Sequence, residues 1–458
     1  MFKEDTIAAI ATPSGYGGVS IIRISGSDAF DVTDKIFKMK NKTIHDVSKN
    51  TINYGHIIDP KTNEVVDEVL VSKMCAPHSF TAEDVTEINC HGGMSVTSRV
   101  LALVLESGAR LADAGEFTKR AFLNGRIDLV QAEAISDLIM AKTNSFAKSA
   151  MNSLKGDLSE KIDEIKADIT NMLARLEVTI QYPEYDEEDL TDNEIVDLIE
   201  KMSFKLKKII STFEKGEILK EGIKVAIIGK PNVGKSQLLN ALINENKAIV
   251  TDEAGTTRDI VDEVVNIKGV PVKFIDTAGI RNADNKVEQI GIDKSISMLE
   301  DSNIILFCID SSRALDSEDI EIIKMLPENK DIIVVLNKMD LDVNEETINA
   351  FENYKTIEIS ALKQEGIEKI ENAIYDIAKV NDNDEVGEIL VSNVRHKNLL
   401  LGAKEDFDHA VEMVHSGLEV DLVEIDINSA LSKLGEITGE TTSEDIIDEI
   451  FKNFCLGK

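Results

Sequence analysis

Five short motifs in the middle of the chain carry the residue types of a nucleotide-binding site. In order they are Gly229-Lys-Pro-Asn-Val-Gly-Lys-Ser236, Gly255-Thr-Thr-Arg-Asp259, Asp276-Thr-Ala-Gly279, Asn337-Lys-Met-Asp340 and Ser360-Ala-Leu362. Each motif is a weak pattern alone, but five in this order and spacing leave little room for chance. Together they predict a site for a guanine nucleotide and Mg²⁺.

The first motif predicts a phosphate-binding loop. Gly229 and Gly234 let the backbone wrap closely around phosphates, so that its N–H groups surround the anion at a helix N-terminus. Lys235 would reach the β- and γ-phosphates, and Ser236 would bind Mg²⁺. An apolar strand at 225–228 precedes the loop, which is the context that this motif needs.

The later motifs predict a switch and a guanine-specific pocket. Asp276 ends an apolar strand, where an acid can hold the Mg²⁺ shell, and the Gly279 N–H can sense the γ-phosphate. The Asp340 carboxylate can accept hydrogen bonds from guanine N1–H and the 2-amino group, which adenine does not offer as donors. The Ser360–Leu362 backbone would support guanine O6. The expected GTP contacts are Asn232, Val233, Gly234, Lys235, Ser236, Gln237, Thr251, Thr256, Thr257, Asp276, Thr277, Ala278, Gly279, Asn337, Lys338, Asp340, Ser360, Ala361 and Leu362.

A potassium ion is the predicted source of positive charge during hydrolysis. Phosphoryl transfer needs charge compensation between the β- and γ-phosphates, which an arginine often supplies. Asn232 stands inside the phosphate loop, as in GTPases that place a monovalent cation there, although it could instead be a polar residue that caps a turn, the weaker alternative. The expected K⁺ ligands are Asn232, Thr256 and the backbone carbonyls of Thr251 and Glu253, which leaves Thr257 to bind Mg²⁺ with Ser236.

Glu288 is the acid that we assign to activation of the attacking water, directly or through a second water. No glutamine directly follows the Asp276–Gly279 motif to orient that water, because Ile280 and Arg281 come next. From the residues alone, Glu288 could equally be a solvated helix residue. The predicted catalytic residues are therefore Glu288 and, through K⁺, Asn232.

Composition favours a multidomain protein of the cytoplasm. A chain of 458 residues should divide into two to four domains. No apolar run is long enough for a spanning helix, and the first residues resemble neither a signal peptide nor an organellar presequence. The four scattered cysteines show no metal-ligand or disulfide pattern, which fits a reducing compartment.

The net charge of −34, from 84 acidic and 50 basic side chains, argues against nucleic-acid binding through bulk charge. Any such contact must use a local basic patch. The candidates are the stretch from Lys201 to Lys208 and the turn Arg395-His-Lys397. The first could also be the solvated face of an amphipathic helix.

Patterning divides the chain into three kinds of domain. Short β-like runs at 6–11, 19–25, 64–74 and 85–90, followed by a helix near Val96, predict an α+β domain at 1–118. An inserted α/β doubly wound G domain of the Ras-like P-loop type is expected at 217–380, where strands and helices alternate. A discontinuous α-helical domain would comprise 119–216 and 381–458.

Apolar spacing sets the expected helices of the helical domain. One long helix should carry the stripe from Leu154 to Ile180, ending at the break at 182–188. Thr191 and Glu194 form a capping-box pattern that restarts a helix with a stripe from Ile195 to Phe213. A second such pattern, Thr441 with Glu444, precedes the last helix, and the acidic segment 381–385 is expected to be flexible.

Segments outside the nucleotide motifs make the whole chain resemble the MnmE (TrmE) family of tRNA modification GTPases. They are Thr12-Pro-Ser-Gly-Tyr-Gly-Gly-Val-Ser-Ile-Ile-Arg-Ile-Ser-Gly26, Ser79-Phe-Thr-Ala-Glu-Asp-Val-Thr-Glu87 with His91-Gly-Gly93, Ala114-Gly-Glu-Phe-Thr-Lys-Arg-Ala-Phe-Leu-Asn-Gly-Arg126 leading into Gln131-Ala-Glu-Ala134, and the terminal Phe454-Cys-Leu-Gly-Lys458. These flanking motifs are far more specific than the GTPase core.

The resemblance implies a homodimer whose N-terminal domain binds folate and dimerises. With the FAD-dependent partner MnmG, such a protein adds a carboxymethylaminomethyl or aminomethyl group to carbon 5 of wobble uridine in certain tRNAs. The one-carbon unit would come from 5-formyl- or methylene-tetrahydrofolate, and the GTP cycle would depend on K⁺. The implied folate contacts are Arg23, Glu87, Arg126 and Lys458.

Departures from the family pattern are small. Arg126 stands where a lysine also occurs, which keeps the charge but changes the donor geometry. Gln237 replaces a serine, and Leu456 replaces an isoleucine. Cys455 could have a thiol role near the folate or could simply anchor the tail as a small buried hydrophobe.

Two other functions remain open on the motifs alone. The nucleotide motifs would also fit a regulatory K⁺-dependent GTPase switch in ribosome assembly or signalling, but that reading leaves the N-terminal domain and the terminal Cys-Leu-Gly-Lys unexplained. The chain could also be a folate-binding scaffold in which GTP only recruits a partner.

Overall fold

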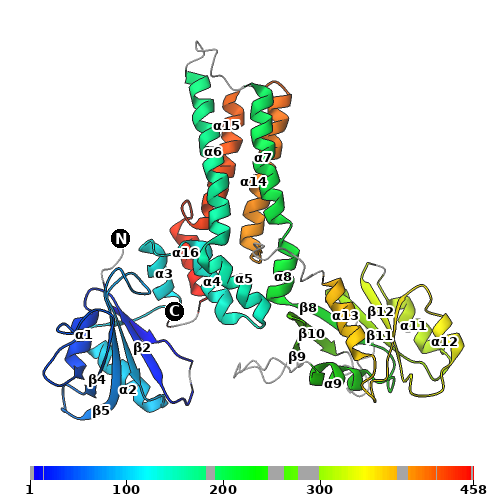
Figure 1. Cartoon of the computed structure of the whole chain (residues 1–458), viewed down its shortest axis with the longest axis horizontal. Helices are drawn as coiled ribbons and strands as arrows, with labels where there is room; N and C mark the ends of the chain where they lie inside the picture. Colours follow the sequence, from blue (N-terminus) through cyan, green and yellow to red (C-terminus); the bar gives the residue numbers. More distant parts are fainter. Residues whose placement is uncertain are drawn as a thin grey trace, which may run out of the picture. The chain divides into compact units, whose positions relative to one another are not determined.

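The computed structural model describes residues 5–13, 15–181, 191–245, 263–276, 299–327, 329–378, 390–418, 420–454 and 457 (Figure 1). The chain divides into two compact units. The first comprises Met1–Ser136, Ser153–Leu198 and Glu405–Lys458, and the second comprises Asp137–Asn152 and Ile199–Lys404. Each unit therefore combines segments that are distant in the sequence.

A seven-stranded sheet forms the N-terminal part of the first unit, in the order β3-β4-β5-β6-β2-β1-β7. Its strands are β1 (Ile7–Ile10), β2 (Ser20–Ser25), β3 (Phe37–Lys38), β4 (Thr51–Ile58), β5 (Val65–Met74), β6 (Val85–Cys90) and β7 (Arg110–Leu111). Helices α1 (Ala29–Ile36) and α2 (Met94–Glu106) pack on one face, over Ile22, Ile24 and Ile88. Because side chains alternate along a strand, Arg23 of β2 faces the opposite side, where it pairs in register with Glu87 of β6.

Helices make up the rest of the first unit and part of the second. They are α3 (Glu116–Leu123), α4 (Leu129–Met140), α5 (Asn144–Lys155), α6 (Asp157–Gln181), α7 (Asp192–Ile210), α8 (Phe213–Glu221), α14 (Val394–His415), α15 (Val420–Thr438) and α16 (Glu444–Lys452). Helix α6 lies along α15, and its buried residues Leu158, Ile162, Ile165 and Ile169 recur every three or four positions, as predicted (Figure 1).

Two helix boundaries differ from the prediction. The expected long stripe is interrupted at Gly156, which has a φ of +102° and separates α5, with Leu154, from α6. The stripe that was expected to continue to Phe213 is also divided, because α7 ends at Ile210 and Phe213 begins α8. The apolar spacing continues across both breaks, so it does not predict where one helix ends and the next begins.

One of the two capping boxes is confirmed. Thr191 N donates to Glu194 Oε2 at 2.9 Å, and Glu194 N donates to Thr191 Oγ1 at 3.4 Å, directly before α7. The Thr441 prediction is wrong, because Ser443 is the N-cap of α16 and Thr441 Oγ1 donates to Ser432 O at 2.8 Å. The break expected at 182–188 and the acidic segment 381–385 lie outside the described residues.

The second unit contains a six-stranded sheet in the order β13-β12-β11-β8-β10-β9. Its strands are β8 (Ile223–Ile228), β9 (Glu263–Ile267), β10 (Val270–Asp276), β11 (Ile304–Asp310), β12 (Asp331–Asn337) and β13 (Lys355–Glu358). All neighbours are parallel except the β9–β10 hairpin. The prediction of an α/β sheet is confirmed.

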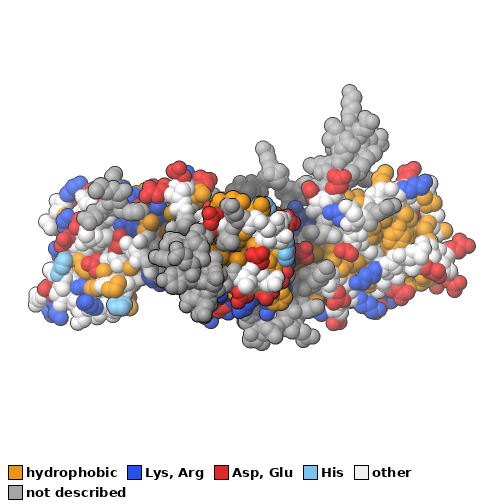
Figure 2. All heavy atoms as spheres, turned by 90° about the horizontal axis from the view of Figure 1, so that it is seen from above, with side chains coloured by type: hydrophobic (Ala, Val, Ile, Leu, Met, Phe, Trp, Pro, Cys, Tyr) orange, Lys and Arg blue, Asp and Glu red, His pale blue; other side chains and the backbone are white. Residues whose placement is uncertain are grey.

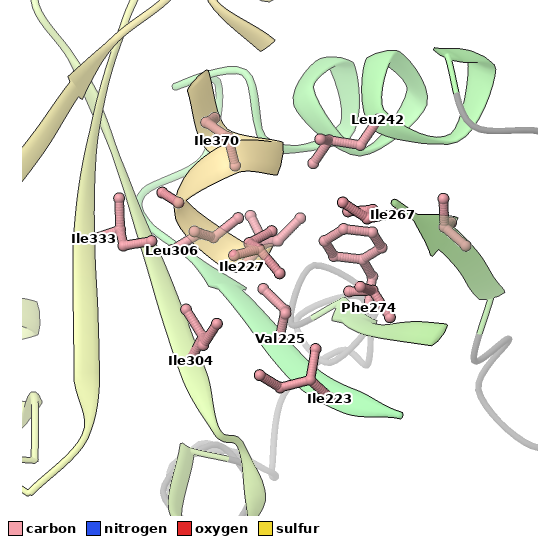
Figure 3. Close-up of a cluster of buried hydrophobic side chains, with 14 of the residues drawn as sticks. Ile223, Val225, Ile227, Leu242, Ile267, Phe274, Ile304, Leu306, Ile333 and Ile370 are labelled. Atoms are coloured by element: carbon pink, nitrogen blue, oxygen red, sulfur yellow. The ribbon is translucent and has the colours of Figure 1, made fainter. Parts of the chain in front are cut away.

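Helices cover both faces of this sheet. They are α9 (Lys235–Glu245), α11 (Ser317–Met325), α12 (Glu345–Asn349) and α13 (Ile367–Ile377). On one face, Val225, Ile227 and Leu306 of the sheet meet Leu242 of α9 and Ile370 of α13 (Figure 3). On the other face, Phe307 packs in a second cluster with Ile322 of α11. Parallel strands buried on both sides leave their carboxyl ends as the open edge of the sheet.

Helix α5 contributes to the core of this second unit. Phe146 is buried in the same cluster as Val265, Ile267 and Phe274. Next to it, a Cβ on Gly269 would lie 2.4 Å from Ser145 Oγ, so the β9–β10 turn approaches the start of α5 closely. A segment that precedes the sheet by more than 70 residues in the sequence thus packs in its core.

Among the helices that the structure describes, none is both long enough and apolar enough to cross a membrane.

Candidate functional site

The loop between β8 and α9 has a backbone that requires glycine at two positions. Gly229 has a φ of +143° and Gly234 a φ of +102°. A Cβ on Gly229 would lie 2.3 Å from Cys308 O, and one on Gly234 would lie 2.1 Å from Asn337 Nδ2. The loop therefore winds tightly against the ends of β11 and β12, and only glycine allows this close approach.

The loop carries one lysine that is bonded to its backbone and three exposed polar residues. Lys235 Nζ donates to Gly229 O at 2.8 Å and to Lys230 O at 2.7 Å. Asn232, with a φ of +66°, is exposed, as are Ser236 and Gln237 at the start of α9. The loop thus presents a cation, an amide and a hydroxyl at one helix N-terminus, a combination that can bind phosphates and a metal ion.

Asn337 connects the phosphate loop to the Ser360–Leu362 segment. Its side chain is 1% exposed. Asn337 Nδ2 donates to Val233 O at 2.8 Å, and Ala361 N donates to Asn337 Oδ1 at 3.0 Å. Both ends of this amide are bonded to backbone, so Asn337 fixes two loops relative to each other.

Asp340 is held by the same segment. Ser360 Oγ donates to Asp340 Oδ1 at 2.7 Å, and Lys363 N donates to Ser360 Oγ at 3.2 Å. The hydrogen bond from Ser360 lowers the pKa of Asp340, so the carboxylate is ionised and oriented. Such a carboxylate is a pure acceptor, which suits the two N–H donors on the edge of guanine.

Lys338 extends beside this edge and bonds to Asp310 at the end of β11, with an Nζ to Oδ2 distance of 2.7 Å. Burial favours the neutral form of Asp310, but the hydrogen bonds from Lys338 and Ser312 outweigh it and lower the pKa of Asp310. Asp310 was not among the predicted residues. Its position at a strand end, level with Asn337 in the β11–β12 register, is the signal that could have identified it.

Several predicted residues lie outside the described part of the chain. These are Thr251, Glu253, Thr256, Thr257, Thr277, Ala278, Gly279, Glu288, Cys455 and Lys458. Asp276 is the last residue of β10, level with Ile227 of β8 in the sheet. Its backbone therefore ends beside the strand that leads into the phosphate loop.

A second polar cluster lies on the face of the N-terminal sheet that is opposite to α1 and α2. Arg23 Nε donates to Glu87 Oε1 at 2.8 Å, and Arg23 Nη1 donates to Gly457 O at 3.4 Å. The guanidinium carbons of Arg23 and Arg126 lie 5.1 Å and 5.2 Å from the centre of the Phe80 ring. Arg126 Nη1 also donates to Phe80 O at 2.8 Å.

This second cluster unites three of the four predicted folate residues and adds Phe80. Two cations, one carboxylate and an aromatic ring can bind an extended ligand with a planar ring and carboxylates. Phe80 belongs to the Ser79–Glu87 motif, but no role was predicted for it. An aromatic residue inside a polar motif is the signal that could have identified it.

Among the described residues, no group of three or more histidine, cysteine, aspartate and glutamate side chains is arranged to hold a metal ion. Hydroxyl and backbone ligands, like those predicted for Mg²⁺, are not of this kind.

Two family models together match nearly all of the chain. The model described as the MnmE helical domain matches residues 129–455, and the one described as the GTP-binding protein TrmE N-terminus matches residues 6–126. A tRNA modification GTPase MnmE from Acetivibrio thermocellus is 49% identical over 462 residues, which are 100% of each chain. Another from Thermoanaerobacter pseudethanolicus is 50% identical over 458 residues, 99% of each chain.

Among solved structures, Era from Aquifex aeolicus bound to GDP.AlF4- is similar to 40% of this chain and 66% of its own, with 30% identity and a TM-score of 0.27. That TM-score is too low to bear on the function. The relatives, in contrast, are similar to this chain from end to end. The chain therefore belongs to the MnmE family of tRNA modification GTPases and couples GTP hydrolysis to the modification of tRNA.

Proposed function

We propose that this protein is the K⁺-dependent GTP-hydrolysing subunit that adds a carboxymethylaminomethyl or aminomethyl group to carbon 5 of wobble uridine. It would act on certain tRNAs as a homodimer, together with the FAD-dependent partner MnmG, and would take its one-carbon unit from a tetrahydrofolate. The tRNA substrate is the reason to place this reaction in the cytoplasm. The observation that carries the proposal is the cluster of Arg23, Glu87, Phe80 and Arg126 beside the tail at Gly457.

The chemistry of this cluster fits 5-formyl- or methylene-tetrahydrofolate. Glu87 can accept hydrogen bonds from a pterin N–H and amino group, since its pairing with Arg23 uses one of its two oxygens in this structure. Arg126 is exposed and can pair with the carboxylates of the glutamate tail, a role that we also assign to Lys458. The Phe80 ring, whose centre lies 5.1 Å and 5.2 Å from the guanidinium carbons of Arg23 and Arg126, adds an aromatic contact beside these cations.

We assign the nucleotide-binding roles as follows. Lys235 neutralises charge on the β- and γ-phosphates, and Ser236 with Thr257 binds Mg²⁺, which in turn compensates phosphate charge. Asp340 selects guanine while Asn337 positions the two loops around it. Glu288 would orient and activate water.

The proposed K⁺ ligands are Asn232, Thr251, Glu253 and Thr256. Support comes from Asn232, which is exposed and lies in the phosphate loop with a φ of +66°. GTP turnover should be much faster in K⁺ than in Na⁺ at equal ionic strength. Asn232→Ala should remove that difference. Equal turnover by the wild-type chain in the two salts would refute the cation assignment.

Mass spectrometry of wobble-uridine nucleosides in bulk tRNA tests the whole proposal. In cells lacking this protein, the carbon-5 aminomethyl derivatives should disappear and should return with the wild-type chain. Glu87→Ala should fail to restore them although the purified variant still hydrolyses GTP. Lys235→Ala should fail because it does not bind GTP. Unchanged nucleosides in the deletion strain would instead favour a regulatory GTPase switch.

A further inference from the structure

Helix α7 exposes a large aromatic side chain to solvent. Phe204 is 71% exposed, whereas Met202, Leu206 and Ile209 on the other side of the same helix are buried. Exposed aromatic residues of this size contribute little to folding, because most of their apolar area remains in water. Phe204 is therefore available for contact with another molecule.

Three lysines surround this ring on the helix surface. Lys201 precedes Phe204 by three residues, and Lys207 and Lys208 follow it by three and four, which are the spacings of surface neighbours on a helix. All three are exposed, and none forms an ion pair with a carboxylate in the described part of the chain. Lysines on other helices, such as Lys161 and Lys452, do form such pairs.

This surface is unusually positive for so acidic a chain. Residues 199–212 contain four lysines and one glutamate, a net charge of 4 − 1 = +3, whereas the whole chain carries −34. On the face of the molecule that Figure 2 displays, acidic and basic side chains are interspersed. A compact positive group of this kind attracts a polyanion locally in spite of the overall negative charge.

The other basic candidate, Arg395-His-Lys397, is engaged within the fold. Arg395 Nη2 lies 3.1 Å from His396 Nε2, and Lys397 Nζ lies 4.1 Å from the centre of the buried Phe213 ring. These contacts hold the start of α14 against α8. Of the two basic candidates in the sequence, only the α7 surface keeps its cations and its aromatic ring exposed.

We propose that the α7 surface formed by Lys201, Phe204, Lys207 and Lys208 docks the tRNA substrate, a proposal that rests on the tRNA-modifying function. The Phe204 ring stacks on an unpaired base, and the lysines bind the adjacent phosphates. Proteins that bind single-stranded nucleic acid combine aromatic rings, on which bases stack, with cations that bind the phosphates. The core of a protein–protein interface is instead depleted of lysine, which disfavours a protein as the occupant.

The test is tRNA binding by the full-length chain, measured by fluorescence anisotropy at several KCl concentrations with tRNA from cells that lack this protein. Phe204→Ala and Phe204→Leu should each weaken binding by about five-fold or more, because both remove the stacking ring. Phe204→Trp, which keeps a ring, should bind as tightly as the wild type.

The double variant K201Q/K208Q should flatten the slope of log K against log salt by about 1.5, the share of two phosphate contacts. The matched control is K148Q/K155Q on α5. This control pair has the same seven-residue spacing on exposed lysines but encloses the aliphatic Met151. It should leave both affinity and slope unchanged.

Each other outcome overturns the proposal. Wild-type tRNA affinity in Phe204→Ala and in K201Q/K208Q would do so, as would tight binding by Phe204→Leu, which would indicate an apolar contact without stacking. Loss of binding to the FAD-dependent partner, with tRNA affinity intact, would assign the surface to a protein. Unchanged GTP turnover without tRNA verifies that the variants fold. If these variants restored the wobble-uridine nucleosides in cells, the docking proposal would be refuted, whereas the proposed modification function would not.

Discussion

Asn337 and Asp340 belong to one guanine motif, but their side chains have different roles at the residue scale. Both polar ends of the Asn337 amide bond to backbone, at Val233 and Ala361. It is therefore a positioning residue. Asp340 instead accepts from a side chain, Ser360. The sequence predicted both residues at the nucleotide, because the motif gives the residue types. It does not give the hydrogen-bond partner of each side chain.

Ser360→Ala should make GTP binding more sensitive to acid. The Ser360 hydrogen bond holds the pKa of Asp340 below its ordinary value of 3.8. Because this pKa is lowered, the Asp340 carboxylate is fully ionised above its ordinary pKa and becomes protonated only as the pH falls through the lowered pKa. Without the hydroxyl the pKa rises, so the acid limb of GTP affinity moves to higher pH.

Titration of a fluorescent GDP analogue from neutral pH down to pH ~3, through the ordinary pKa of an aspartate, measures this shift. At neutral pH the loss of orientation should weaken binding by about three- to ten-fold. Ser360→Thr retains the hydroxyl and serves as the control. An acid limb that is identical in Ser360→Ala and the wild type would show that Asp340 does not depend on this bond.

Lys73 is a buried cation whose removal should destabilise the first unit. It is 6% exposed, its Nζ donates to Ile44 O at 2.8 Å and to Val47 O at 3.1 Å, and it lies 4.8 Å from the centre of the Phe30 ring. Lys73→Met would leave these carbonyls without a donor and should cost about 2–4 kcal/mol in the free energy of unfolding.

Urea denaturation of Lys73→Met measures this cost. The matched control is Lys35→Met, since Lys35 Nζ also donates to a carbonyl, Ser107 O at 2.7 Å, but in an exposed position. The control should change the free energy of unfolding by less than about 0.5 kcal/mol. Equal effects of the two substitutions would mean that burial adds nothing to these bonds.

At the scale of elements, alternation and apolar runs predicted most strands and the α/β class of the second sheet. The run at 85–90 coincides with β6, and the apolar run at 225–228 lies within β8. Strand β4 was missed because Gly55 interrupts its apolar residues. A Cβ there would lie 2.4 Å from Lys38 O and 2.5 Å from the Phe37 ring, so glycine marks a close approach of β3 that single-sequence propensity cannot reveal.

Gly216→Ala in α8 should destabilise the second unit, contrary to the usual effect of such a change inside a helix. A Cβ on Gly216 would lie 2.2 Å from Val391 O, in the segment that Thr212 also holds by accepting from Val391 N at 3.2 Å. Because the obstacle is backbone, it cannot turn away. The expected loss is about 1–3 kcal/mol.

Thermal denaturation compares this variant with Gly93→Ala, whose added Cβ would meet nothing within 4 Å. The control should melt within a degree or two of the wild type, since about 1 kcal/mol moves the midpoint by only a few degrees in a chain of this size. A Gly216→Ala protein that melts at or above the wild-type temperature would show that the Val391 segment does not pack on α8 as described.

At the scale of the whole molecule, the sequence predicted the kinds of domain better than the division of the chain between them. Residues 144–152 of α5 cluster with the α/β sheet, because Phe146 completes its core. Helices α7 and α14 each contribute to both compact units. Periodicity identifies an amphipathic helix but not which of two apolar cores its stripe will cover, so this division required the structure.

The residues of the proposed dimer contact and those of the phosphate loop belong to different compact units. Residues 1–118, to which we assign dimerisation, lie in the first unit. Lys235 lies in the second unit, where its Nζ donates to Gly229 O and Lys230 O of the phosphate loop. Lys235→Ala should therefore abolish GTP binding and leave the oligomeric state unchanged. Removing one cation from the loop affects phosphate binding directly, while the first unit keeps its own core.

Analytical ultracentrifugation of the full-length variant without nucleotide, beside equilibrium binding of a fluorescent GTP analogue, measures both properties. The expected result is the sedimentation coefficient of the wild-type dimer with no detectable binding. Lys230→Ala is the matched control, since Lys230 is a lysine of the same loop that pairs with Asp316 and is not an expected GTP contact. This control should retain both the dimer and GTP binding. A monomeric Lys235→Ala protein would mean that the phosphate loop takes part in association, and dimerisation could then no longer be assigned to residues 1–118 alone.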